Sequence, residues 1–305
     1  MAPPQNITDG IAAAISDLTT TASTHTSTSP SSQSNGQSAN PSTCVTPQTP
    51  LSPLPEAEMY DLICVGFGPA SLATAIAIHD TSSTEFQPKC LYLEKQPNFA
   101  WHSGMQIPGA KMQISFLKDL ATPRQPTSTF TFLNYLQSVG RLHAFINLGT
   151  FLPSRKEFEA YLKWCAAKFE DKHQVRYGTV VLNVQPCTVE DGKVVSWEVT
   201  GRSSENEILS WRAKNVVVAL GGTAAVPEGL RKLDNIYHSS QYIHQITRIA
   251  ANDSELFGRR VTFGVIGGGQ SAAEICNDLW DRFPEANVKL IIKDSSLRPS
   301  DDSPL

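Results

Sequence analysis

Two glycine turns in this sequence have residue types and spacing suited to binding a phosphate group. The first reads G-x-G-x-x-S, with Gly66, Gly68 and Ser71 at the fixed positions. The second reads G-x-G-x-x-A and contains Gly268, Gly269, Gln270 and Ser271. Glycines allow a tight turn and let the backbone approach a pyrophosphate closely, which then lies at the N-terminus of the following helix. Such a turn is common on its own, so its meaning depends on the elements around it.

The first turn is flanked by the elements of a βαβ unit. "DLICVG" predicts a buried strand before it, "ASLATAIAI" predicts a helix of small and apolar residues after it, and "KCLYLEK" predicts a second strand ending in Glu94. An acidic residue at this place accepts hydrogen bonds from the hydroxyl groups of a ribose. The pattern therefore predicts a dinucleotide site. The alternative is an ordinary glycine turn with Glu94 exposed to solvent.

The second turn has a similar setting but a different charge. The predicted strand 261–266 leads into it, and the strand after the helix, "VKLII", ends in Lys293. An acid favours a free ribose 2′-hydroxyl, whereas a cation accommodates a 2′-phosphate. The first site thus suits FAD and the second suits NADPH. Alternatively, Lys293 is a solvated residue at a strand end, and its neighbour Asp294 weakens the charge argument.

Two such turns in one chain predict an α/β protein with two dinucleotide-binding domains. We expect a Rossmann-like FAD domain at 59–225 and an inserted Rossmann-like NADPH domain at 226–305 that is incomplete at its C-terminal end. The segment "KNVVVALGGTAAVP" predicts a strand and turn where the chain crosses between them. Residues 1–58 contain no Lys or Arg and are rich in Ser, Thr and Pro, which predicts a disordered tail.

Composition excludes several other classes of protein. The net charge of −4 and the lack of a basic patch argue against nucleic acid or an anionic membrane surface as a partner. No apolar run has the length of a membrane span. The six cysteines include no C-x-x-C pair, which argues against a disulfide scaffold, a zinc site and a disulfide reductase. Reduced thiols and a cytoplasmic location are the simplest interpretation.

Two longer segments carry a resemblance to a known family. "WHSGMQIPGAKMQISFLKDLATPRQPTSTFTFLNYL" and "FLPSRKEFEAYLKWCA" resemble the L-ornithine N5-monooxygenases, and the similarity runs from about residue 60 to residue 304. The resemblance implies N-hydroxylation of the side-chain amine of L-ornithine with O2, FAD and NADPH, as the first step of hydroxamate siderophore biosynthesis. The family continues past residue 305, so the resemblance also implies that a C-terminal portion is missing.

The resemblance assigns roles to matching positions. Gln113 matches a glutamine that contacts FAD beside its ring, Lys118 matches the lysine that binds the substrate carboxylate, and Val181 matches a backbone contact to the adenine. No side chain is implied as a covalent catalyst. The second glycine turn matches the NADPH loop, and Lys293 stands where the family tends to have Arg. The run that would line FAD from ribose to flavin consists of Glu94, Lys95, Gln96, Pro97, Asn98, Phe99, Ala100, Trp101 and His102.

Several alternatives stay open. Trp101 and His102 have a second interpretation as packing residues, Gln113 as a surface strand residue, and Lys118 with Asp119 as a solvated pair. The helix predicted after Ser154 is assigned to structure, with a capping box and a buried face at helical spacing. A lysine N6-hydroxylase or another amine N-monooxygenase is the nearest rival function, because one methylene is discriminated only modestly. A more distant alternative is a chain that binds nucleotide but catalyses no reaction. The sequence leaves the oligomeric state open, a homo-oligomer included.

Overall fold

The computed structural model describes residues 58–252, 260–293 and 295–297. The predicted tail, apart from residue 58, and the neighbour Asp294 therefore lie outside the described residues. The chain divides into two compact units, residues 1–59 and residues 60–305, and only the second is described in detail. The described elements are helices and strands in a mixed arrangement, which confirms the predicted α/β class.

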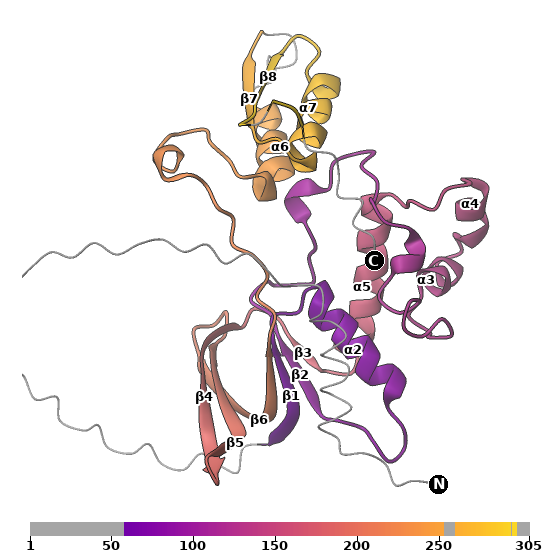
Figure 1. The fold of residues 1–305 in the computed structure, drawn as a ribbon, viewed down its shortest axis with the longest axis vertical. Coiled ribbons are helices and arrows are strands. Elements are labelled where there is room, and N and C mark those ends of the chain that lie inside the picture. The colour runs from indigo at the N-terminus through magenta and orange to yellow at the C-terminus, as the bar shows by residue number, and fades with distance from the viewer. Residues whose placement is uncertain (1–57, 253–259, 294, 298–305) are drawn as a thin grey trace, which may run out of the picture. The chain divides into compact units, whose positions relative to one another are not determined.

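The second unit contains a six-stranded sheet (Figure 1). Its strand order is β3-β2-β1-β6-β5-β4. The first three strands in that order pair in parallel, and the last three form an antiparallel meander. The strands are β1 (Met59–Val65), β2 (Cys90–Leu93), β3 (Val175–Arg176), β4 (Val180–Glu190), β5 (Lys193–Arg202) and β6 (Ile208–Val218).

The continuous apolar run of β1 is explained by burial on both faces of the sheet. Leu62 and Cys64 pack into a cluster with residues of the helices α2 and α5, whereas Ile63 packs on the opposite face with Trp211 and Val199 of the meander. All five side chains are at most 9% exposed. The helices of this part are α2 (Pro69–Thr81), α3 (Phe132–Ser138), α4 (Leu142–Asn147) and α5 (Arg155–Glu170).

Helix α5 follows its sequence prediction closely. Ser154 is the N-cap residue, and its hydroxyl accepts a hydrogen bond from the backbone N–H of Glu157 at 3.0 Å. The predicted core face is buried: Phe158, Tyr161, Leu162 and Cys165 are each at most 6% exposed. The helix is therefore a rigid support, and its first residue is Arg155.

The second glycine turn belongs to a smaller group of elements. Strands β7 (Thr262–Ile266) and β8 (Asn287–Ile291) pair in parallel, and α6 (Tyr242–Asn252) and α7 (Gln270–Arg282) pack with them around Ile275 and Phe283. The buried residues Met105 and Ile107, from the segment after β2, belong to the same apolar cluster.

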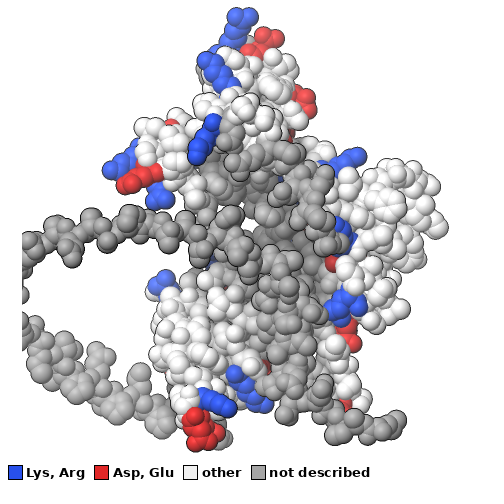
Figure 2. Space-filling view, viewed as in Figure 1, with Lys and Arg blue, Asp and Glu red and all other residues white. Residues whose placement is uncertain are grey.

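Charged residues are dispersed in the described part of the chain. On the face drawn in Figure 2, the Lys and Arg side chains are interspersed with Asp and Glu and form no continuous basic surface among the described residues. No helix within those residues combines the length and the apolar character that crossing a membrane requires.

Candidate active site

The first glycine turn joins β1 to α2, and its two glycines meet different surroundings. Gly66 has φ +98°, and a Cβ there would lie 2.4 Å from the carbonyl oxygen of Ala219. Gly66 is therefore required by the close approach of the chain after β6. A Cβ at Gly68 would meet no atom of the described residues within 4 Å. Gly68 is also the N-cap of α2, and no described side chain caps this helix. The open space thus lies where backbone N–H groups and the helix dipole favour an anion.

Ser71, the third small residue of this turn, is 1% exposed in the first turn of α2. Its hydroxyl oxygen has no hydrogen-bond partner among the described atoms. The burial agrees with the expectation that a small side chain here lets helix and strand pack closely.

Glu94 follows β2 directly and is 8% exposed, so the alternative of a solvated carboxylate is wrong. One carboxylate oxygen accepts the backbone N–H of Phe67 at 2.8 Å, and the other accepts that of Gln96 at 2.9 Å. Glu94 therefore fixes the glycine turn from the next strand. A carboxylate has about four acceptor sites, so it keeps capacity for ribose hydroxyls.

The run from Lys95 to His102 follows the C-terminal end of β2, and two of its residues, Phe99 and Trp101, pack in the apolar cluster that contains Leu62 and Cys64. Lys95, Gln96, Pro97 and Asn98 are exposed, whereas Phe99 is buried with its ring 6.0 Å from that of Phe67. Ala100 is half-buried. Trp101 is also half-buried and packs on the ring of Phe158 at 5.8 Å. The packing interpretation thus fits Trp101, which can also contact a flavin. His102 is exposed, and its ring centre lies 4.9 Å from that of Trp101.

The second turn repeats the design of the first. Gly267 has φ +139°, and Gly269 is the N-cap of α7, again without a capping side chain from the part of the chain that is described. A Cβ at Gly269 would meet nothing within 4 Å in that part. A Cβ at Gly268 would lie 3.7 Å from the side chain of Ile292, the residue before Lys293. Lys293 is exposed two residues beyond the end of β8, and its role beside a 2′-phosphate stays a prediction.

A cavity of about 300 Å³ brings residues of both predicted nucleotide sites together. Trp101, His102 and Gln113 line it from the predicted flavin side, and Gln270 and Ser271 line it from the second turn. The remaining lining residues are Met105, Lys111, Met112, Ile114, Arg155 and Glu274.

Gln113 is exposed and lies in a bend. The alternative of a surface strand residue is therefore right about its exposure and wrong about the strand. The isolated bridge between Lys111 and Ser154 holds this bend beside the start of α5. A backbone hydrogen bond of 2.8 Å from Met112 to Pro153 continues that contact.

Lys118 ends a short 3₁₀ helix, Phe116–Lys118, and is half-buried. The next residue, Asp119, is 7% exposed and accepts hydrogen bonds from the backbone N–H groups of Ala121, Thr122 and Phe132. The interpretation of Lys118 and Asp119 as a solvated pair is therefore wrong for Asp119. Lys118 has no ion pair among the described residues and does not line the cavity.

Val181 lies in β4 opposite Gly201 of β5 and packs partly against the buried face that contains Trp211. The register of the ladder shifts between Val181 and Asn183. Val181 and Lys293 both lie outside the lining of the cavity.

Sequence reasoning missed the ion pair that lines the cavity. Arg155 and Glu274 form an ion pair at 2.8 Å, with side chains 13% and 18% exposed. Arg155 was assigned to a structural helix, and Glu274 lies four residues after Gln270. The spacing of Gln270 and Glu274 on one helix face was the only signal available. Partial desolvation and the nearby Arg155 guanidinium lower the pKa of His102 from its ordinary value.

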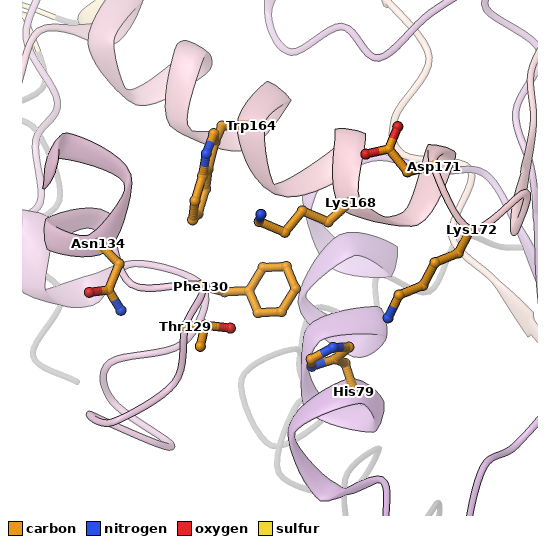
Figure 3. A pocket seen from close by; sticks show the side chains of 8 residues that line it. All are labelled: His79, Thr129, Phe130, Asn134, Trp164, Lys168, Asp171 and Lys172. Atoms are coloured by element: carbon orange, nitrogen blue, oxygen red, sulfur yellow. The ribbon is translucent and has the colours of Figure 1, made fainter. Parts of the chain in front are cut away.

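A second, larger cavity of about 620 Å³ lies elsewhere, at the ends of α2 and α5 (Figure 3). It is lined by His79, Phe130, Trp164, Lys168 and Lys172, among others, and by no predicted site residue. The Lys168 ammonium lies 4.8 Å from the centre of the Trp164 ring. Positive side chains at helix C-termini are a common structural feature, so size alone does not make this cavity the site.

Comparison with known proteins decides the family. The family of L-lysine 6-monooxygenase/L-ornithine 5-monooxygenase matches residues 58–305. The chain belongs to this family. An L-ornithine N(5)-monooxygenase of Arthroderma benhamiae is 51% identical over 266 residues, which cover 84% of this chain and 52% of that protein.

Solved structures of family members agree with the fold. An ornithine hydroxylase from Pseudomonas aeruginosa is 39% identical, with a TM-score of 0.72 over 81% of this chain and 58% of its own. An ornithine N-hydroxylase of Kutzneria sp. 744, solved with reduced FAD, NADP+ and L-ornithine, is 34% identical with a TM-score of 0.72, over 81% of this chain and 56% of its own. These structures confirm the resemblance and the predicted two-nucleotide flavoprotein fold. The chain spans about half the length of the curated relatives it matches. The predicted domain boundaries stay predictions.

Proposed function

We propose that this chain contains the FAD- and NADPH-binding portion of an L-ornithine N5-monooxygenase. The cavity that contains Trp101, His102 and Gln113 together with Gln270 and Ser271 is the observation that carries the proposal. A hydride donor and a hydride acceptor must share one site, and this cavity joins the two predicted nucleotide sites. Relatives named as ornithine monooxygenases or hydroxylases support the same assignment.

The residues present fit two dinucleotides. At each turn, the second glycine of the motif is the uncapped start of a helix, and a side chain there would enter open space. That open space is the cradle that a pyrophosphate needs. Glu94 would hold an adenosine ribose while keeping its turn in place, and Lys293 would pair with a 2′-phosphate. When bound, FAD and NADPH supply hydride transfer and oxygen activation.

The protein's own residues would bind the flavin and the substrate, orient the substrate, and shield the reacting centre from water. Gln113 has amide donors that suit flavin oxygens, and Trp101, which lines the cavity, would provide an apolar wall beside a bound flavin. The ammonium of Lys118, which has no ion pair among the described residues, would suit a substrate carboxylate. An anchor on the carboxylate directs the side-chain amine, and not the α-amine, toward the reacting centre. Because an alkylammonium has a pKa of about 10.4, the site must select the neutral amine or remove its proton.

The names of the relatives favour L-ornithine as the substrate, and L-lysine stays as the second candidate. The family includes L-lysine 6-monooxygenases, and the two substrates differ by one methylene, worth roughly 1–3 kcal/mol in an apolar pocket. The proposal also places the reaction at the first step of hydroxamate siderophore synthesis and the protein in the cytosol. A nucleotide-binding chain without catalysis is the alternative from another class.

One experiment separates these functions. The purified chain is supplied with FAD, and flavin retention, NADPH oxidation and hydroxylated amine are measured with ornithine and with lysine in parallel. Retained flavin and N5-hydroxyornithine support the proposal, and product from lysine alone favours the rival. Retained flavin without hydroxylated product from either amine identifies a nucleotide-binding chain. A chain that retains no flavin contradicts the FAD assignment.

A further inference from the structure

Arg155 makes three hydrogen bonds at the cavity. Its guanidinium donates to both carboxylate oxygens of Glu274, each at 2.8 Å, and to the backbone carbonyl of Met105 at 2.7 Å. The pair joins the first residue of α5 to α7, which lies 119 positions later in the chain. Two parallel N–H···O bonds fix the orientation of both side chains as well as their distance.

Glu274 passes this constraint on to the second glycine turn. One of its carboxylate oxygens also accepts the side-chain N–H of Gln270 at 2.7 Å. Gln270 is the first residue of α7 and follows Gly269 directly. A continuous series of hydrogen bonds therefore runs from the Met105 carbonyl through Arg155 and Glu274 to the start of the helix.

Net stability is a poor explanation for this arrangement. A partly buried ion pair such as this one gains little over well-packed apolar side chains, because both charges lose part of their water. What the pair provides is a defined geometry between the bend that contains Gln113 and the turn that contains Gln270. The same guanidinium also lowers the pKa of His102 at the cavity wall, after the effect of burial.

We propose that the Arg155–Glu274 pair is a positioning device that holds the second nucleotide turn at a fixed distance from the flavin-side wall of the cavity. The identity of the two nucleotides rests on the proposed function, whereas the positioning itself does not. Hydride transfer requires reacting atoms about 3–3.5 Å apart, and a misplacement of about 1 Å costs on the order of 100-fold in rate. Arg155 and Glu274 would thus act through Gln270 and its turn, as positioning residues.

The first test uses hydrogen exchange on the chain without nucleotides. Arg155→Gln and Glu274→Gln should each accelerate amide exchange in residues 267–275, and the double variant should add little beyond either single one. Arg155→Lys keeps the charge but loses the two-pronged geometry, so its exchange should be intermediate. Arg141→Gln is the matched control, because Arg141 forms an exposed ion pair with Glu157 at the other side of α5's first turn.

The second test measures flavin reduction in the chain loaded with FAD. At saturating NADPH, we expect both neutral variants to reduce flavin about 10- to 100-fold more slowly, with unchanged FAD content. Unchanged exchange in 267–275 together with a normal reduction rate would overturn the proposal. A lower melting temperature with normal exchange and reduction would do the same, since the pair would then be structural only. If the unaltered chain retains no FAD, the proposed function fails, and the exchange experiment still decides the positioning.

Discussion

The two glycines of the first turn should differ in how strongly substitution affects stability. At Gly68, φ is −85° and a Cβ meets open space, so Gly68→Ala in the FAD-free chain should change the free energy of unfolding by less than about 1 kcal/mol, because the gain from a stiffer unfolded chain is offset by the poorer N-cap. At Gly66, φ is +98° and a Cβ lies 2.4 Å from the Ala219 oxygen. Gly66→Ala should therefore lower it by roughly 1–3 kcal/mol from backbone strain alone. One kcal/mol corresponds to about 2–4 °C in a chain of this size.

For FAD binding, Gly68 should be the more sensitive of the two glycines. Gly68→Leu places a side chain in the space through which a pyrophosphate would approach, so flavin should be lost although the fold is intact. FAD at 100 times its Kd stabilises a protein by about 2.7 kcal/mol, or roughly 5–11 °C in melting temperature. This shift should be present in the unaltered chain and absent in Gly68→Leu. Flavin absorbance and a melting curve with and without FAD measure both effects. Unchanged flavin content in Gly68→Leu would refute the assignment of this turn to the pyrophosphate.

Three further predictions concern single side chains. Lys118→Ala should raise the apparent ornithine KM about ten- to a hundredfold, leave flavin reduction near normal and divert oxygen to hydrogen peroxide; an unchanged KM with full coupling would contradict the carboxylate anchor. Lys293→Glu should weaken NADPH relative to NADH, measured as the ratio of kcat/KM values, and a constant ratio would leave Lys293 a surface lysine. Because burial and Arg155 lower the pKa of His102, the unfolded chain binds this proton more readily, so the free energy of unfolding should fall as pH drops below about 6.5. Denaturant titrations at pH 5 and 8 should show a smaller difference for His102→Asn, which tolerates the left-handed backbone there, and an identical difference would contradict this role.

The parts of the fold that depend on neighbouring residues could be predicted from the sequence. The strand, turn and helix around Gly68 have local signals, as do the cap and buried face of α5. Glu94 shows the limit of this reasoning. Its place after the strand was predictable, but its hydrogen bond to Phe67, 27 positions earlier, depends on how the two strands pair. The prediction that the last strand reaches Lys293 was wrong, because β8 ends at Ile291.

The cavity could not be predicted as a whole because its members come from distant segments with little regular structure. Gln113 lies in a bend, and only its bridge to the start of α5 fixes its place. Arg155 has the sequence signature of an ordinary residue in the first turn of a helix. Its function becomes visible only with Glu274, since a salt bridge across 119 positions leaves no periodic pattern in the sequence.

The run from Glu94 to His102 connects the first glycine turn to the cavity. At one end, Glu94 is tied to the first glycine turn by the N–H of Phe67. At the other end, Trp101 and His102 line the cavity that also contains Gln270. Nine residues span at most about 30 Å when extended, so one elongated ligand could follow the whole run. Such a ligand would have its ribose at the acid and its ring in the cavity, facing the start of α7. This path supports a flavin dinucleotide in the first site more directly than the glycine motif does, because the motif specifies only where the phosphates bind.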